Sequence, residues 1–243
     1  MSFSSISSVA LSRDASDISF HINDDSSPLL DDAMLTVDLV LSTQAKAIAY
    51  LTNQYRKSQW SRSQMKKSLR ILNNGLNAGG KIVLSGIGKS YKIAAKIVAT
   101  LNSLSVQSAL LHPSEALHGD LGIIREERGD VVILVSASGN TTELINLLNY
   151  IPGNVPVILM TSSRKSQLSE NPRVSSLLYA ELPKRLSEKL LYGLSAPTIS
   201  TTLCLTLLDA TSIALAELYM NDLELRRSDL AIATLEVQLA QIQ

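Results

Sequence analysis

Two short segments rich in glycine and hydroxyl side chains could bind an anion such as a phosphate group. The first is Ser85-Gly86-Ile87-Gly88-Lys89-Ser90, and the second is Ser136-Ala137-Ser138-Gly139-Asn140-Thr141-Thr142-Glu143. Each follows a short apolar run typical of a strand and precedes a helical pattern. Glycines let a backbone approach a ligand closely, and the free N–H groups at the start of a helix attract negative charge. The two segments are therefore candidate anion-binding loops.

The first segment departs from two common nucleotide-binding motifs. A P-loop needs a glycine at residue 83, where this chain has Val83. A dinucleotide fingerprint that begins at Gly86 needs a glycine at residue 91, where this chain has Tyr91. Two interpretations remain, and the segment alone supports them about equally: a loop that binds a phosphate-sized anion, and a tight turn between a strand and a helix.

The second segment has a structural alternative as well. Asn140 as an N-cap, with Glu143 three residues later, matches a capping box. Capping accounts for these two residues but leaves the other hydroxyls of the segment unexplained, so anion binding is favoured. The two segments together strengthen that interpretation, because consecutive strand ends in one sheet converge.

Acid–base side chains gather in the segment from His112 to Gly122. It contains His112, Glu115, His118 and Asp120, and these could donate or accept protons at the mouth of a sheet. A metal site is less favoured, because the spacing matches no zinc motif.

Apolar runs of strand length alternate with helical patterns through the middle of the chain. The predicted strands are 81–85, 107–111, 130–136, 155–161 and 177–182, and the predicted helices are 61–76, 90–104 and 141–150, after a first helix from about Thr36. Continuous apolar strands separated by helices indicate an α/β fold with a doubly wound, five-stranded parallel sheet, capped by the N-terminal helices. A ligand would then bind beyond the carboxyl ends of the strands, near the switch in strand order.

Composition narrows the class of protein. The 22 basic and 22 acidic side chains balance, which argues against nucleic-acid and membrane partners. Cys204 is the only cysteine, so a reducing, cytoplasmic location is expected. The start lacks the features of a signal peptide, and we expect no run of about 18 apolar residues that could span a bilayer. We predict a disordered serine-rich tail over 1–32, a binding domain over 33–220 and a C-terminal helix over 221–243.

The motifs resemble the sugar isomerase (SIS) domain family, and within it the D-arabinose-5-phosphate isomerases. The pattern of that branch is GxGKSG, HPxEAxHGDLG, SxSGExxE and ExxxxGLAPT, and its specific piece is complete here from His112 to Gly122. The resemblance covers roughly residues 76–218. It implies an SIS-like fold and the interconversion of arabinose 5-phosphate and ribulose 5-phosphate through an enediol, without a cofactor or a metal.

The resemblance also implies roles for individual residues. The sugar phosphate would be held by the two loops, with these residues: Gly86, Gly88, Ser90, Ser136, Ser138, Gly139 and Thr141. Lys89 would lie near the reacting oxygens, although it could serve only to neutralise phosphate. Glu143 and Glu188 are the candidate carboxylates. His118 would assist proton transfer or ring opening, unless it is a structural histidine.

Several positions depart from the family pattern. Tyr91 replaces a glycine, Asn140 replaces a glutamate, and Ser195 interrupts the segment that follows Glu188. The family's His-Pro-Gly-Gly segment, whose histidine is thought to reach a neighbouring subunit, is missing, because the chain has no glycine after Gly193. The downstream nucleotide-sensing repeats of bacterial relatives are also expected to be absent.

Two hypotheses follow for the function. The first is an active phosphosugar isomerase, and the second is a phosphosugar-binding module without turnover, suggested by the missing histidine segment. A protein interaction role for the tail and the C-terminal stripe has only composition behind it. Since SIS-like proteins usually build their sites between subunits, we expect a homo-oligomer.

Overall fold

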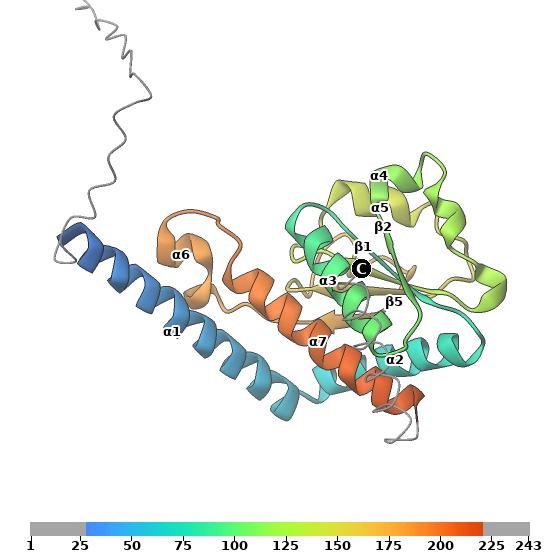
Figure 1. Ribbon diagram of the computed structural model, residues 1–243, viewed down its shortest axis with the longest axis horizontal. Coiled ribbons are helices and arrows are strands. Elements are labelled where there is room, and N and C mark those ends of the chain that lie inside the picture. The colour runs from blue at the N-terminus through green and yellow to red at the C-terminus, as the bar shows by residue number, and fades with distance from the viewer. Residues whose placement is uncertain (1–27, 221–243) are drawn as a thin grey trace, which may run out of the picture. The chain divides into compact units, whose positions relative to one another are not determined.

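The computed structural model describes residues 28–220, and its centre is a parallel sheet of five strands (Figure 1). The strands are β1 (Ile82–Gly86), β2 (Ser108–Leu111), β3 (Val131–Val135), β4 (Val157–Thr161) and β5 (Val174–Tyr179). Their order is β2-β1-β3-β4-β5, and every pairing is parallel. The predicted α/β fold with a doubly wound parallel sheet is confirmed.

Helices cover both faces of this sheet. The long ones are α2 (Gln59–Asn77), α3 (Lys89–Ser103) and α7 (Ile199–Tyr219), and the shorter ones are α4 (Pro113–Ala116), α5 (Thr142–Leu148) and α6 (Glu188–Tyr192). The described residues also contain three 3₁₀ helices, η1 (Asp120–Ile123), η2 (Glu126–Arg128) and η3 (Lys184–Leu186). Both faces must be covered, because β3 has the sequence Val-Val-Ile-Leu-Val and all five of its residues are buried.

Alternate residues of each strand point into two separate hydrophobic cores. Ile82 and Leu84 of β1 belong to one core, which also contains residues of α2, α3 and α7. Val83 lies in the other core, with residues of α5 such as Leu144. The two-residue period of a strand produces this division. Figure 1 shows α3 and α7 side by side, and these two helices become important at the site.

Polar side chains close the outer edge of β5, which would otherwise present unpaired backbone groups. The Gln64 side-chain oxygen accepts a hydrogen bond from the Leu177 N–H at 3.0 Å. Gln54 donates its amide to the Tyr179 carbonyl at 2.8 Å and accepts from the Glu181 N–H at 3.1 Å. β5 begins three residues before the predicted strand. Its first half was not predicted because it contains the polar residue Ser176, which hydrogen-bonds to Ser68 of α2.

The chain divides into two compact units, 1–40 and 41–243. Helix α1 (Pro28–Lys57) begins well before Thr36, at a proline that suits the first turn of a helix. The prediction of a disordered tail through residue 32 is therefore wrong for 28–32, which are helical. The remainder of that tail and the predicted C-terminal helix over 221–243 lie outside the described residues.

Helix α7 corrects one expectation from the sequence. By length and composition it is the one helix in residues 28–220 that could cross a membrane, whereas no such stretch was expected. Core helices of proteins without a membrane span meet the same criterion. In this chain the buried residues Leu203, Leu207 and Leu215 of α7 pack in the core beside β1 and α3.

Candidate functional site

The two predicted anion-binding segments begin side by side at one edge of the sheet. Gly86, the last residue of β1, pairs with Val135, the last residue of β3. The strand order switches here, because β1 connects outward to β2 while β3 lies on its other side. Ligands of doubly wound proteins bind at such a switch point. The convergence that the sequence predicted for these segments is confirmed.

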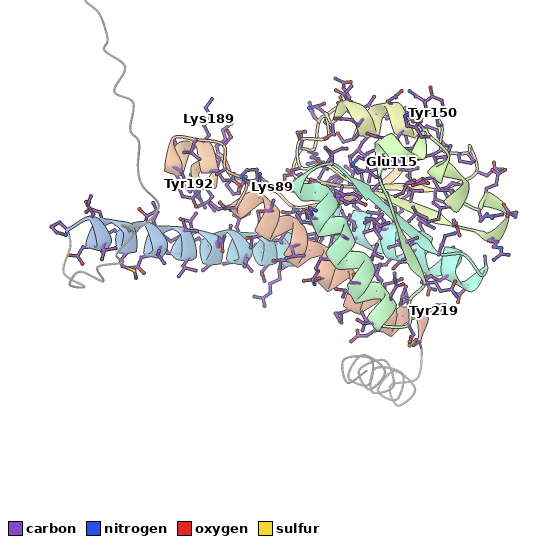
Figure 2. The ribbon with its side chains drawn as sticks, turned by 45° about the horizontal axis from the view of Figure 1, so that its top comes forward. Lys89, Glu115, Tyr150, Lys189, Tyr192 and Tyr219 are labelled. Atoms are coloured by element: carbon purple, nitrogen blue, oxygen red, sulfur yellow. The ribbon has the colours of Figure 1, made fainter. Side chains whose placement is uncertain are left out.

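Gly86 allows the first segment to turn sharply into α3. A Cβ atom on Gly86 would lie 2.9 Å from the Ser90 carbonyl carbon and 3.0 Å from the Tyr91 nitrogen, both of them backbone atoms. Real Cβ atoms essentially never approach another atom within 3.0 Å, so a side chain at Gly86 would force the backbone at the start of α3 to shift. Lys89 is the first residue of α3, and Figure 2 shows it where the start of α3 faces α7.

The hydroxyls of the second segment are ordered by one another. Ser136 is buried, and its Oγ accepts a hydrogen bond from the Gly139 N–H at 3.0 Å and shares one with Thr141 Oγ1 at 2.7 Å. Ser138 Oγ accepts from the Asn140 N–H at 3.2 Å. Thr141 is the N-cap of α5 and makes no side-chain cap hydrogen bond, so the capping box built on Asn140 is not observed.

The loop between β4 and β5 braces the second segment from behind. The Gly139 carbonyl accepts from the Leu168 N–H at 3.0 Å, and Asn140 Oδ1 accepts from the Gln167 N–H at 3.0 Å. Gly139 has a φ of +67°, and a Cβ there would lie 2.1 Å from Ser166 Oγ. A glycine is needed at this position for both reasons. Asn140, which departs from the family pattern, therefore helps to fix the loop.

A pocket of about 270 Å³ opens between the two segments and α7. Its lining consists of Ile87, Lys89, Ser90, Ile93, Ala137, Pro197, Ser200, Thr201 and Cys204. The second segment contributes only Ala137 to this lining, and Ser136, Ser138, Gly139 and Thr141 lie outside it. Sequence reasoning missed Ser200 and Thr201, although the hydroxyl-rich start of an otherwise apolar helix was a signal that could have identified them.

The other predicted catalytic residues lie outside the lining of this pocket. Glu143 is exposed in the first turn of α5, and His118 is exposed in the turn between α4 and η1. His112 has a structural role, because it is the N-cap of α4 and its Nδ1 accepts from the Ser114 N–H at 3.3 Å. Its ring also packs against that of Tyr91 in a T-shaped arrangement, with centroids 5.0 Å apart.

Glu188, the first residue of α6, is a buried carboxylate that contacts the start of α7. Its Oε1 accepts hydrogen bonds from Thr198 N at 3.2 Å, from Ser200 N at 2.8 Å and from Ser200 Oγ at 2.6 Å. Burial by itself would raise the pKa of this carboxyl, but the hydrogen bonds from Ser200 and Thr198 outweigh it, so the pKa lies below its ordinary value. Glu188 is therefore ionised at neutral pH.

Two further observations concern metal and thiol chemistry. Within residues 28–220, no group of three or more His, Cys, Asp or Glu side chains is arranged to hold a metal ion. Cys204 lines the pocket, but burial raises the pKa of its thiol to about 12, so it is protonated at neutral pH. A protonated thiol is a poor nucleophile.

Known proteins are similar to this chain in sequence and in fold. It is 36% identical over 198 residues to the arabinose 5-phosphate isomerase KpsF of Escherichia coli O6:H1, covering 80% of this chain and 55% of that protein. It is 39% identical over 142 residues to the arabinose 5-phosphate isomerase KdsD of Pseudomonas aeruginosa, covering 57% of this chain and 40% of that one. The chain thus spans about half the length of these curated relatives.

A solved structure matches the chain more completely. The protein of E. coli CFT073 solved in complex with arabinose 5-phosphate is 28% identical, with a TM-score of 0.67, covering 83% of this chain and 97% of that one. A family model for the SIS domain matches residues 76–214, which include both polar segments, the pocket lining and most of α7. Because this match covers more than half of its residues, the chain belongs to the SIS domain family.

Proposed function

We propose that this protein is a phosphosugar isomerase that interconverts an aldose phosphate and a ketose phosphate, with arabinose 5-phosphate and ribulose 5-phosphate as the candidate pair. The observation that carries the proposal is the pairing of Gly86 with Val135, which brings both polar segments to one pocket at the strand switch point. The relatives named as arabinose 5-phosphate isomerases support the choice of substrate.

The phosphoryl group would bind where the two segments meet. Ser90 and the backbone around Gly86 and Gly88 would hold it from one side, and the segment from Ser136 to Thr141, through Ser138 and Gly139, from the other. The starts of α3 and α5 add the positive ends of two helix dipoles. Binding of this unreacting part of the sugar would position the carbonyl end for chemistry.

The reaction requires a proton to leave the carbon next to the carbonyl and to return to the neighbouring carbon. Lys89 lines the pocket and would stabilise the negative charge that develops on the enediol oxygen. Glu143 and His118 are the candidate groups for moving protons. Both are exposed in this chain, which supports a site that a second copy of the chain completes.

A homo-oligomer is therefore part of the proposal. The part of α1 in the unit 1–40 exposes large apolar side chains, including Leu29 at 79% and Leu35 at 67% exposure. Clusters of this kind usually mark contact surfaces. Light scattering coupled to size-exclusion chromatography tests the assembly.

The single cysteine, which is buried, supports a reducing, cytoplasmic location.

The second candidate is a phosphosugar-binding module without turnover. It is favoured by the position of His118 and Glu143 outside the pocket lining. The experiment that separates the two candidates incubates the protein with arabinose 5-phosphate and detects ribulose 5-phosphate, alongside thermal unfolding with the same sugar. Turnover supports the isomerase. A raised Tm without turnover supports the binding module. If neither is observed, both proposals are wrong.

A further inference from the structure

The first turn of α7 supplies a second wall of the pocket, with chemistry that differs from that of the two polar segments. Ser200 lines the pocket together with Lys89 and Ser90. Neither the family motifs nor the sequence patterns assigned a role to this serine. Its surroundings determine which kind of ligand group it can meet.

The hydroxyl proton of Ser200 is already committed. Ser200 Oγ lies 2.6 Å from Glu188 Oε1, and an ionised carboxylate can only accept hydrogen bonds. The single hydroxyl proton must therefore point at Glu188. The oxygen of Ser200 keeps its lone pairs, so towards the pocket it acts as an acceptor. Donation to a negatively charged partner also strengthens that oxygen as an acceptor.

This polarity separates two parts of a sugar phosphate. An ionised phosphoryl group offers only acceptor oxygens, so Ser200 in this state has no proton to give it. A sugar hydroxyl carries a proton and can donate it to the Ser200 oxygen. The segments after β1 and β3 present N–H groups and hydroxyls, which suit the phosphoryl end.

Glu188 holds this arrangement in place. The same oxygen accepts from Thr198 N at 3.2 Å and from Ser200 N at 2.8 Å, so it fixes both the hydroxyl and the backbone at the start of α7. The residue is only 7% exposed, and it is absent from the pocket lining. A carboxylate with these three contacts is suited to orienting Ser200 rather than to reaching a substrate carbon.

We propose that Ser200 accepts a hydrogen bond from a hydroxyl of the bound sugar phosphate, and that Glu188 is the positioning residue that orients Ser200. The inference rests on the proposed function, because it concerns the same pocket. It replaces the role of catalytic carboxylate that the resemblance suggested for Glu188. Glu143 then remains as the candidate carboxylate for proton transfer.

The first experiment compares the wild-type protein with Ser200→Ala. Loss of one hydrogen bond should lower kcat/KM for arabinose 5-phosphate about tenfold. Inhibition by inorganic phosphate should change less than about twofold, because phosphate needs no acceptor. Thr202→Val is the matched control: its hydroxyl donates to the Thr198 carbonyl on the same helical turn, outside the pocket lining. This control should retain wild-type kinetics.

The second experiment separates positioning from proton transfer. Glu188→Gln retains an oxygen that can accept from Thr198 N and Ser200 N, so kcat/KM should fall by about tenfold or less, and the pH profile should keep its acidic limb. Glu188→Ala removes the acceptor and should raise KM further. A base would instead lose about 10²-fold to 10⁴-fold in kcat in both variants, and the acidic limb would disappear.

The outcomes are distinguishable from failure of the proposed function. If the wild-type protein binds arabinose 5-phosphate without turnover, the same variants are compared by calorimetric Kd, with the same fold-changes expected. If the wild type is active or binds the sugar, and Ser200→Ala has the same kcat/KM or Kd as the wild type, the proposed role of Ser200 is wrong. If Ser200→Ala weakened inhibition by inorganic phosphate as much as it lowered kcat/KM for arabinose 5-phosphate, Ser200 would be a phosphate ligand, and the inference would be contradicted. A wild type that neither binds nor turns over the sugar overturns the proposed function, and this inference with it.

Discussion

Gly86 and Val135 are paired neighbours at the carboxyl ends of β1 and β3. Through this pair, two segments that are about fifty residues apart in the chain leave the sheet side by side. Neither segment is distinctive by itself, since each also suits an ordinary strand-to-helix turn. Their juxtaposition at the strand switch point, around a pocket that α7 completes, is what gives them a common function.

Replacement of Gly86 by alanine tests the close packing at the first segment. The new Cβ would lie 2.9 Å from the backbone of Ser90, so the start of α3 must shift. We expect the free energy of unfolding in urea to fall by about 1–3 kcal/mol and inhibition by inorganic phosphate to weaken at least about tenfold. Gly153→Ala is the control, because a Cβ there meets nothing within 4 Å. Equal behaviour of the two variants would contradict this assignment.

Replacement of Asn140 tests the electrostatics of the second segment. Asn140→Asp keeps an oxygen that can accept from Gln167 N, so the Tm should change little, but it adds a negative charge beside the proposed phosphate position. Phosphate inhibition should therefore weaken several-fold, and more strongly at low ionic strength. Asn140→Ala removes the brace and should lower the Tm instead. Unchanged phosphate inhibition in Asn140→Asp would place the anion elsewhere.

The reactivity of Cys204 follows from its pKa. Burial raises the pKa of this thiol to about 12, whereas the pKa of an exposed cysteine is about 8.5. Near pH 8, the native protein should therefore react with a thiol reagent on the order of a thousandfold more slowly than the unfolded protein. The measurement is the rate at which Cys204 reacts with the reagent, with and without denaturant. Similar rates in the two states would show that the pocket leaves this sulfur ionised and accessible.

The ionisation of Glu188 couples to folding stability with a definite sign. Its pKa is lowered in the folded protein, so its stabilising contribution is complete above the ordinary value of 4.5 and is lost as the pH falls below it. The free energy of unfolding of the wild type should therefore fall more steeply than that of Glu188→Gln as the pH drops from about 6 to about 3.5. Parallel curves would mean that the carboxylate gains nothing from its contacts with Ser200 and Thr198.

The fold was largely predictable from the sequence, because apolar runs such as Val131–Val135 allow little except a buried strand. The strand β5 was placed three residues late, since the partner of Ser176 is Ser68, a residue 108 positions earlier. No local pattern can reveal such a contact.

The site was predictable only in part. Strand topology was enough to bring Ser90 and Ser136 to one edge of the sheet. The less favoured alternative, an N-cap at Asn140, is not observed, because Thr141 is the N-cap of α5 and Asn140 is engaged with Gln167 of another loop. Ser200 was missed, because its contact with Glu188 depends on how α7 starts.

The most direct measurement is a crystal structure of this protein with arabinose 5-phosphate bound. The account predicts a phosphoryl group within hydrogen-bonding distance of both Ser90 and the segment from Ser136 to Thr141, with a sugar hydroxyl at Ser200. A phosphoryl group that contacts only one of the two segments, or that lies away from the edge formed by Gly86 and Val135, would contradict it.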